Sequence, residues 1–488
     1  MRRVHAFGDD ALGDLDAVGL ADAIRAGRVG RTDVIEAAIA RTEAVDPALN
    51  GLAHEAFGQA RDLASSAPAS GFFSGVPTFL KDNVDVAGQP TMRGTDAWAP
   101  QEAVADSVFT KLFLATGATS LGKTQMSEFG FSASAEHPRL GPVRNPWDTD
   151  YTAGASSSGS GAFVAAGVVP IAHANDGGGS IRIPAACNGL VGLKPSRGRL
   201  PLDQELRRMP VGIVANGVLT RSVRDTAAFY REAERFWRNP KLAPVGDVTR
   251  PGRQRLRIAV LTRSVQRESS PEVRELTLKS AALLEELGHR VEHVDDPPVP
   301  ASFVDDFVLY WGFLALAQVR SGRRLFGSTF DRTRLDSLTL GLDRHTGRNM
   351  HRLPLAIVRL RRLRRRTAQF FGTYDVVLTP TVAEETPRIG YLAPTDYQQV
   401  IDRLVSWVAF TPLQNVTGEP AISLPLALSA EGMPVGMMLS ADLGQEALLL
   451  ELAYELEEAR PWARIQAPPM IPSVNDPVSR TRAFRASV

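Results

Sequence analysis

A serine that follows three consecutive glycines is the feature of this sequence that points most directly to chemistry. Residues 173–184 read HANDGGGSIRIP, and the serine is Ser180. Glycine loses more conformational freedom on folding than any other residue, so an ordered run of glycines needs a reason. One interpretation is a flexible surface loop. The other is a rigid turn whose main-chain N–H groups approach a ligand, as in an oxyanion hole, and this interpretation requires a base that activates Ser180.

A histidine base is the first alternative. The nucleophile elbow of the α/β-hydrolases has glycine two positions before and two positions after the serine. Ser180 has Gly178 before it but Arg182 after it, and the serines at 156, 157, 158 and 160 fail the same test. His173 is the nearest histidine in sequence, and its place in the apolar run VVPIAHAN is more typical of a hydrogen-bonded core residue. A histidine distant in sequence stays open as the base.

A serine and a lysine in the order S-x-x-K form the second alternative. Ser120-Leu-Gly-Lys123 matches the first motif of the penicillin-recognising enzymes. Lys123 is followed by Thr124 and Gln125, so no K-T-G motif is formed, and the chain has no S-D-N motif. So short a pattern arises by chance in a chain of this length, and we disfavour this chemistry.

Metal-dependent chemistry has little support in the sequence. His289 and His293 lie in a predicted strand at an edge of the core, and no third ligand is evident. Cys187 is the only cysteine, which excludes an intrachain disulfide and a cysteine-rich metal site. We predict no metal and no cofactor.

A neutral lysine is the third alternative for the base. A free lysine has a pKa of about 10.4 and is charged at pH 7, whereas burial among apolar groups lowers that pKa by several units. Lys81 ends the apolar segment GVPTFL and precedes a polar turn, so it lies at the mouth of a buried strand. An ordinary strand-end lysine that reaches water is the structural alternative.

Predicted strands and helices must position these candidates. Between residues 75 and 201, short apolar strands alternate with glycine-rich turns and the small-residue helix SGAFVAAG. Residues 256–262, 271–288 and 289–294 read as strand, helix and strand, a unit suited to parallel pairing. Further buried strands are predicted at 374–382, 420–428 and 434–441, followed by a helix at 445–458. This order of elements predicts one large α/β domain.

The composition is that of a globular protein with balanced charge. Of 488 residues, 44% are hydrophobic and 22% are charged, and 55 basic against 54 acidic residues give a net charge of +1. This balance argues against a general nucleic-acid or membrane-surface binder. No secretory signal and no apolar run of about 18 residues is present, so we predict a cytoplasmic protein. The arginine-rich segment 357–371 is interpreted as an amphipathic helix with a solvated basic face, with a phosphate or membrane contact as the alternative.

Three sequence blocks, in this order, resemble the signature blocks of the amidase signature family. They are GVPTFLKDN (75–83), TAGASSSGSGAFVAAG (152–167) and NDGGGSIRIPAACNGLVGLKPSRGR (175–199). LGKTQMSEFG, PVRNPWD and QNVTGEPAISLPLALSAEGMPVGM also resemble the family, which leaves a gap in similarity from about 200 to 370. The resemblance implies the fold class: an α/β protein with a large mixed central β-sheet covered by helices on both faces.

The resemblance also implies a Ser-Ser-Lys catalytic triad. Lys81 matches the base, Ser156 the relay serine, and Ser180 the nucleophile. The family has a cis peptide bond before the relay serine, here between Ala155 and Ser156. Lys81 then takes a proton from Ser156, and Ser156 takes one from Ser180 as that oxygen attacks an amide carbonyl. The implied products are a carboxylate and either ammonia or an amine.

Further residues of the same blocks are expected to support the triad. Ser157 is the expected supporting serine, and Asp176 and Arg182 are expected to pair beneath the turn and hold its shape. The expected oxyanion hole consists of main-chain N–H groups, those of Gly177, Gly178, Gly179 and Ser180.

Three positions depart from the usual family pattern. Ala155 and Ser158 stand where glycines are usual, and Asn175 stands where threonine is usual. All three triad positions are intact, so these departures bear on the subfamily and leave the chemistry unchanged. The Asn175-Asp176 pair and the segment NVTGEPAISLP resemble the branch that includes the nylon-oligomer (6-aminohexanoate cyclic dimer) hydrolase.

Two other functions compete with amide hydrolysis. The A subunit of a tRNA-dependent amidotransferase shares the triad but usually carries a tyrosine-rich stretch, whereas residues 343–363 contain no tyrosine. A catalytically inactive binding homologue is disfavoured by the intact triad. We therefore predict an amidase that acts on a small-molecule amide, with no nucleic-acid or membrane partner and with homodimerisation left open.

The family resemblance also suggests how the chain is divided. We expect a single amidase domain over 1–488, made of an N-terminal helical segment (1–65), the catalytic region (75–201), a variable substrate-pocket region (202–410) and the C-terminal part of the core (411–470). Pocket-forming segments are expected at about 125–140 and 300–410. Within the second, FVLYWGF (307–313) is read either as an aromatic wall of the pocket or as part of the core.

Overall fold

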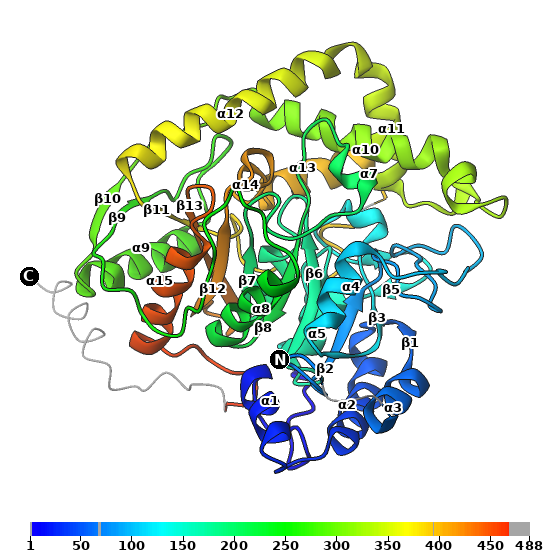
Figure 1. Cartoon of the computed structure of the whole chain (residues 1–488). Helices are drawn as coiled ribbons and strands as arrows, with labels where there is room; N and C mark the ends of the chain where they lie inside the picture. The colour runs from blue at the N-terminus through cyan, green and yellow to red at the C-terminus, as the bar shows by residue number, and fades with distance from the viewer. Residues whose placement is uncertain (1, 67–69, 394, 468–488) are drawn as a thin grey trace, which may run out of the picture.

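An eight-stranded mixed β-sheet forms the centre of the protein in a computed structural model that describes residues 2–66, 70–393 and 395–467 (Figure 1). Across the sheet, the strands are β10 (Arg290–His293), β9 (Arg257–Val260), β11 (Val376–Pro380), β13 (Pro434–Ala441), β12 (Ala421–Leu428), β7 (Val191–Lys194), β8 (Ala215–Thr220) and β6 (Ile171–Asp176). β9 pairs in parallel with β10 and β11, and the other neighbours are antiparallel. Met1 and the end of the 411–470 segment, from residue 468, lie outside the described residues.

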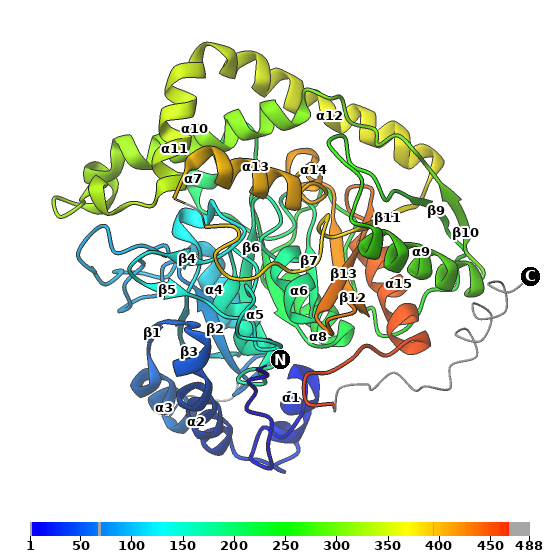
Figure 2. The same ribbon diagram turned by 180° about the vertical axis from the view of Figure 1, so that it is seen from behind.

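Helices cover both faces of this sheet. On β13, Met437 Sδ accepts a hydrogen bond from Thr277 Oγ1 of α9 (Pro271–Glu286) at 3.4 Å. The next residue, Met438, accepts one at its Sδ from Arg182 Nη1 of α6 (Arg182–Asn188) at 3.3 Å. Neighbouring residues of a strand point to opposite faces, so α9 and α6 lie on different sides. Figure 1 shows α8 (Val223–Phe236) and α15 (Glu446–Ala459) in front of the sheet, and Figure 2 shows α5 (Ser158–Ala165) and α6 from behind. The predicted fold class is confirmed, as is the parallel unit formed by β9, α9 and β10.

A three-stranded sheet beside β6 carries one of the candidate residues. It consists of β1 (Leu52–Glu55), β3 (Thr119–Thr124) and β2 (Pro77–Lys81), in that order. Thr78 of β2 donates a hydrogen bond to the carbonyl oxygen of Ile171 in β6 at 2.9 Å, so the two strands lie side by side. All residues of β2 are buried. The end of β2, and Lys81 with it, therefore lies next to the end of β6.

The remaining helices form an N-terminal group and a cap. The N-terminal group is α1 (Ala17–Arg25), α2 (Arg31–Leu49), α3 (Phe57–Ser66) and α4 (Val108–Ala115). The cap helices, which lie across the top of the sheet in Figure 1, are α10 (Phe303–Phe326), α11 (Ser337–Asn349), α12 (Leu353–Thr373), α13 (Tyr397–Trp407) and α14 (Pro412–Thr417). Short elements complete the list: β4 (Glu136–His137), β5 (Gly141–Pro142) and α7 (Gln204–Arg207). No helix in the described ranges has the length and apolarity needed to cross a membrane.

The arginine-rich segment is part of the amphipathic helix α12, as predicted. Its buried residues recur at three- and four-residue spacing: Leu353, Ala356, Leu360, Leu363 and Thr367. Arg359 bonds to Asp306 of α10 at 2.7 Å, and Arg364 bonds to Asp442 at 2.7 Å. Some of its arginines therefore attach the helix to its neighbours, and the remainder extend along its exposed side.

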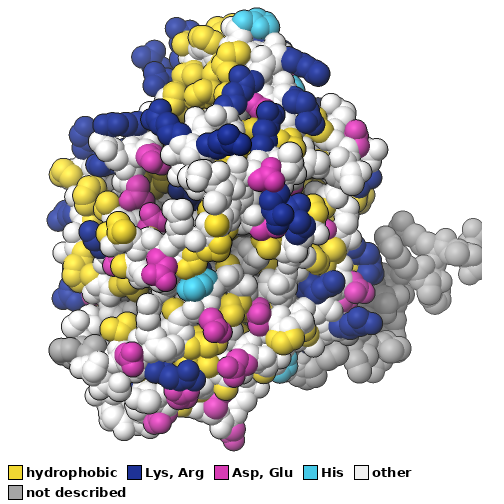
Figure 3. Space-filling view, turned by 90° about the vertical axis from the view of Figure 1, so that its right-hand side faces the viewer, with side chains coloured by type: hydrophobic (Ala, Val, Ile, Leu, Met, Phe, Trp, Pro, Cys, Tyr) yellow, Lys and Arg dark blue, Asp and Glu magenta, His cyan; other side chains and the backbone are white. Residues whose placement is uncertain are grey.

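The balanced net charge conceals an uneven distribution. Residues 303–373 contain 14 arginines, no lysine and 5 aspartates or glutamates. Figure 3 shows basic side chains gathered over the upper part of one face, and acidic side chains mainly below them. The cap helices are therefore strongly basic, and the rest of the chain carries a net negative charge.

Candidate active site

The end of β2 brings the amine of Lys81 against the hydroxyl of Ser156. Lys81 Nζ donates a hydrogen bond to Ser156 Oγ at 2.6 Å, across 75 positions in the chain. Both residues are buried, with 0% and 2% of their surface exposed. The peptide bond between Ala155 and Ser156 is cis. The two residues thus come from separate sequence blocks into direct contact.

Burial gives Lys81 the property of a base. Removal from water disfavours its ammonium form and lowers the pKa of Lys81 to about 7, although the negative charge of Asp176 acts in the opposite direction. Near pH 7, roughly half of the Lys81 amines are therefore neutral. A neutral amine at hydrogen-bond distance from a hydroxyl can accept its proton.

Two side chains of β6 hold Lys81 in place. Asn175 Oδ1 accepts a hydrogen bond from Lys81 Nζ at 2.6 Å, and His173 Nδ1 accepts one from the main-chain N–H of Lys81 at 3.2 Å. His173 and Asn175 are two positions apart on a strand and so point to the same face. Burial lowers the pKa of His173 to about 3, and the nearby charge of Lys81 adds to this effect. His173 is therefore a neutral core residue that holds the backbone of Lys81.

A buried ion pair holds the turn between β6 and α6. Arg182 Nε lies 2.9 Å from Asp176 Oδ2 and Arg182 Nη2 lies 3.0 Å from Asp176 Oδ1, and neither side chain is exposed. The same carboxylate accepts hydrogen bonds from the N–H groups of Gly179 at 2.7 Å and Ile181 at 3.2 Å. Burial by itself raises the pKa of Asp176, but the charge and hydrogen bonds of Arg182 outweigh it, so that this pKa is lowered. The expected pair is present, and it fixes the turn that carries Ser180.

Replacing Asp176 by asparagine is expected to lower the free energy of unfolding by about 3–5 kcal/mol, because Arg182 stays buried without its counter-charge. Urea unfolding followed by circular dichroism measures the change. Glu36→Gln is the control, since it removes an exposed ion pair with Arg61 and is expected to leave stability nearly unchanged. Equal stability losses in the two variants would contradict the structural role of Asp176.

Gly179 makes a contact within the turn that the sequence did not predict. Its N–H group donates to Asp176 Oδ1 and is therefore engaged within the turn. Glycine is needed here because φ is +136°, a conformation that side chains disfavour, and because a Cβ atom would lie 2.4 Å from Thr411 Oγ1. In the described part of the chain, the N–H groups of Gly177, Gly178 and Ser180 donate to no protein acceptor.

Side chains at the start of α14 and within it hold the same turn from a distant part of the chain. Asn415 Nδ2 donates to Asp176 O at 2.9 Å and to Asp176 Oδ1 at 2.8 Å, and Thr411 Oγ1 donates to Gly178 O at 2.6 Å. The sequence did not reveal either role. The only signal was that Asn415 belongs to the block QNVTGEP, which resembles the family without indicating what it contacts.

Ser157 and Gly130 lie against the two catalytic candidates. Ser157 Oγ donates a hydrogen bond to the carbonyl oxygen of Ser180 at 2.6 Å. Gly130 has a φ of +78°, and a Cβ atom there would lie 3.1 Å from Ser156 Oγ. The block LGKTQMSEFG therefore ends in a glycine that leaves room for the Ser156 hydroxyl.

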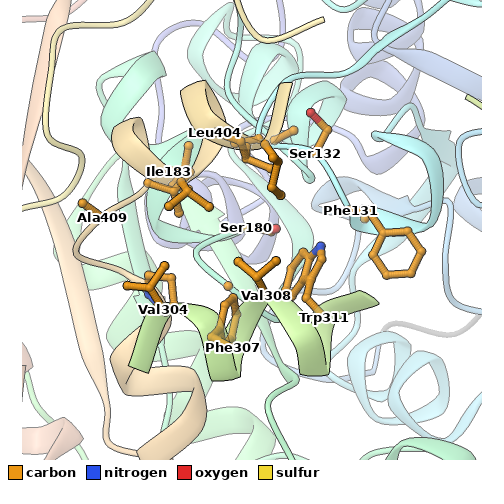
Figure 4. Close-up of a pocket in the computed structure, with 18 of the residues that line it drawn as sticks. Phe131, Ser132, Ser180, Ile183, Val304, Phe307, Val308, Trp311, Leu404 and Ala409 are labelled. Atoms are coloured by element: carbon orange, nitrogen blue, oxygen red, sulfur yellow. The ribbon is translucent and has the colours of Figure 1, made fainter. Parts of the chain in front are cut away.

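Ser180 borders an apolar cavity beneath α10 and α13. Including its open mouth, the cavity measures about 670 Å³. Most of its lining comes from the two segments expected to form the pocket, and it includes Phe131, Ile183, Val304, Phe307, Val308, Trp311 and Leu404 (Figure 4). None of the described lining residues is charged. The segment FVLYWGF supplies three residues to this wall, whereas its Tyr310 is buried in the core.

Comparison with known proteins agrees with this geometry. Residues 33–450 match the protein family described as Amidase. The chain belongs to the amidase signature family. It is therefore an amide hydrolase, and the family predicted from the sequence blocks is confirmed.

Three relatives illustrate the place of this amidase in the family. It is 83% identical over 466 residues to "Putative amidase AmiC" of Mycobacterium leprae, covering 96% of this chain and 99% of the relative. It resembles the structure of a 6-aminohexanoate cyclic dimer hydrolase complexed with substrate, with a TM-score of 0.84 and 32% identity over 94% of this chain and 99% of the other. A bacterial aryl acylamidase of the amidase signature family gives a TM-score of 0.81 and 26% identity over 92% and 97% of the two chains.

The other residue sets considered in the sequence lie outside the site of this amidase. Lys123 Nζ lies 3.7 Å from Asp82 Oδ1 in a buried pair, and within the described ranges no hydrogen bond joins it to Ser120. His289 is buried and lies 3.0 Å from a glutamate, while His293 is exposed. These contacts are structural.

Proposed function

We propose that this amidase hydrolyses a carboxylic amide through an acyl-enzyme on Ser180. Neutral Lys81 accepts the proton of Ser156, and Ser156 accepts the proton of Ser180 as the Ser180 oxygen attacks the carbonyl carbon. Ser156 then protonates the leaving nitrogen, which departs as ammonia or an amine, and Lys81 returns its proton to Ser156 and is neutral again. Water hydrolyses the acyl-enzyme through the same relay and releases the carboxylate. In this proposal residues 1–488 act as a single amidase domain.

The observation that carries this proposal is the 2.6 Å contact between Lys81 Nζ and Ser156 Oγ, combined with the lowered pKa of Lys81. A lysine of ordinary pKa is charged at pH 7 and accepts no proton. Among the hydrogen bonds of the described residues, none joins Ser156 to Ser180. The relay therefore requires the Ser180 hydroxyl to turn toward Ser156 when substrate binds, and catalytic hydrogen bonds often tighten at that stage.

The oxyanion hole in this proposal consists of the N–H groups of Gly177, Gly178 and Ser180. Gly178 and Ser180 line the cavity, and all three N–H groups are free of protein acceptors in the part of the chain described. The loss of one such donor typically reduces transition-state stabilisation by about 3 kcal/mol. Gly179 contributes through the shape of the turn, which Ser157, Asp176 and Arg182 hold in place as supporting residues.

The apolar cavity favours a neutral small-molecule amide with an apolar acyl or amine part, because an ionised group there would lose its hydration without a counter-charge. The similarity to a hydrolase of the 6-aminohexanoate cyclic dimer supports this substrate class. Esters are expected as slower or alternative substrates, since they form the same acyl-enzyme.

The amidase is proposed to act either as a monomer or as a homodimer, and analytical sedimentation distinguishes the two states. The amidotransferase alternative is not favoured, because relatives with 83% and 82% identity to this chain are named as amidases.

Labelling with a serine-reactive fluorophosphonate tests the proposed nucleophile. The adduct, located by mass spectrometry, is expected on Ser180, because an activated hydroxyl beside the cavity reacts in preference to other serines. Heat-denatured protein is the control and is expected to remain unlabelled. An adduct on a different serine of the native protein would overturn the assignment.

Replacing Asn175 by alanine is expected to move the acid limb of kcat/KM to lower pH. Asn175 Oδ1 accepts a hydrogen bond from Lys81 Nζ and so stabilises its charged form, and the loss of this acceptor lowers the pKa of Lys81. The pH profile with one amide substrate measures the shift. Asn239→Ala is the control, because its amide bonds to Gly198 and does not contact Lys81. A shift to higher pH, or none, would contradict the contact's role.

A further inference from the structure

The indole nitrogen of Trp311 is a buried donor in an otherwise apolar wall. Trp311 lies on α10 and lines the cavity next to Ser180. Its Nε1 atom is shielded from solvent, and no acceptor among the described residues bonds to it. Among the described residues that line the cavity, Trp311 is the only one with a buried side-chain nitrogen or oxygen atom that lacks a hydrogen-bond partner. Because a buried N–H group without a partner is unfavourable, this donor is expected to bond to an atom of the substrate.

The position of the ring places this donor away from the proposed oxyanion turn. A Cβ atom on Gly178 would lie 3.0 Å from Trp311 Cη2 and from Trp311 Cζ3, so the outer edge of the six-membered ring rests on the proposed oxyanion turn. The nitrogen belongs to the other ring of the indole and lies away from that contact. Figure 4 shows it on the side of the ring that faces Ser132 and Ser180.

Two aromatic neighbours fix the orientation of Trp311. The ring of Phe131 lies 5.9 Å away at 68°, and that of Phe307 lies 5.3 Å away at 39°. Such packing restricts rotation of the indole before substrate arrives. A donor held in one orientation loses little entropy when it forms a hydrogen bond, and it selects an acceptor at one position.

We propose that Trp311 Nε1 donates a hydrogen bond to a second acceptor oxygen of the substrate, one separated from the scissile amide by a short apolar spacer. This inference rests on the proposed function of Ser180 and narrows its substrate class. The substrates are neutral amides that carry an ether oxygen or a second carbonyl oxygen within an otherwise apolar part. Such an oxygen satisfies the indole N–H, whereas a charged group would be desolvated without a partner in this wall.

A set of anilides tests the position of the acceptor. Their unbranched acyl chains have equal length, and one methylene group at a time is replaced by an ether oxygen. For the wild type, kcat/KM for one ether isomer is expected to exceed that for the other isomers by a few-fold to about tenfold. Wild-type protein that shows no such positional preference would overturn the inference.

Two replacements of Trp311 test the donor itself. Trp311→Phe, and replacement of Trp311 by 3-benzothienylalanine, which keeps the ring shape without the N–H, are both expected to abolish the preference. Val405→Ala is the control, because it alters the apolar wall on the α13 side and keeps Trp311 and its two aromatic neighbours, so the preference is expected to remain. Retention of the preference in the benzothienyl variant would overturn the inference even if Trp311→Phe failed to fold.

The same experiment separates this inference from the proposed function. Wild-type protein that hydrolyses no anilide and takes up no fluorophosphonate on Ser180 would contradict both. Labelling of Ser180 together with anilide hydrolysis, but with no dependence of the ether preference on Trp311, would contradict the role of Trp311 alone.

Discussion

Ser180→Ala is expected to lower kcat/KM for amide hydrolysis by about 10⁴-fold or more, because no acyl-enzyme forms without the Ser180 oxygen. Release of aniline from a simple anilide measures the rate, and loss of fluorophosphonate labelling provides a second reading. Structural damage should be small, since the hydroxyl of Ser180 makes no hydrogen bond to another described residue and borders the cavity.

Ser120→Ala is the matched control for this result. Ser120 belongs to the literal S-x-x-K pattern and is buried like Ser180. Among the described residues, its hydroxyl bonds only within its own strand, to the carbonyl oxygen and the N–H group of Gly122, each at 3.3 Å. We expect this variant to keep its activity. A large loss in Ser120→Ala, with activity retained in Ser180→Ala, would revive the lysine-paired alternative and contradict the proposed nucleophile.

Lys81→Met is expected to reduce kcat/KM by about 10²–10⁴-fold, the usual contribution of a general base. The proposed mechanism needs neutral Lys81, whose pKa is lowered to about 7, so wild-type kcat/KM should rise with pH and reach half its plateau near pH 7. Below that pH Lys81 is protonated and cannot accept the proton of Ser156. In Lys81→Met, the rise of kcat/KM with pH around pH 7 should disappear from the pH profile of the residual activity.

Lys194→Met separates the effect of the base from the effect of losing a buried lysine. Lys194 is also fully buried, and burial lowers the pKa of Lys194 to about 7 as well. Its Nζ, however, donates to the carbonyl oxygen of Pro195 at 2.7 Å. We expect the pH limb near 7 to persist in this variant. If it vanished here and persisted in Lys81→Met, the base would be assigned to the wrong lysine.

Much of the fold could be predicted because its signals are local. The strand at 256–262 and the helix at 271–288 appear as β9 and α9, and the next strand pairs in parallel as expected. The predicted ranges are slightly too long, since β9 covers Arg257–Val260 and α9 ends at Glu286. Element ends depend on neighbouring strands and caps, which a run of apolar residues does not specify.

The contact of Gly179 could not be predicted for a related reason. A glycine run shows that the main chain must adopt unusual conformations or approach another group closely. It does not show which group each N–H meets. The carboxylate of Asp176 takes the N–H of Gly179, and Thr411, more than 200 positions away in the chain, occupies the space of the absent Cβ.

The amino-acid sequence by itself determined the family and the α/β fold class, and it singled out Lys81, Ser156 and Ser180 as the catalytic candidates, because the glycine-rich turn and the flanking blocks are short and contiguous. Only the tertiary structure decided that burial lowers the pKa of Lys81 to about 7, that Asn175 binds its amine, and that Trp311 lines an apolar cavity beside Ser180. These properties depend on burial and on contacts between segments far apart in the chain. A side chain's solvation, and with it its chemistry, is set by what packs around it in the folded protein.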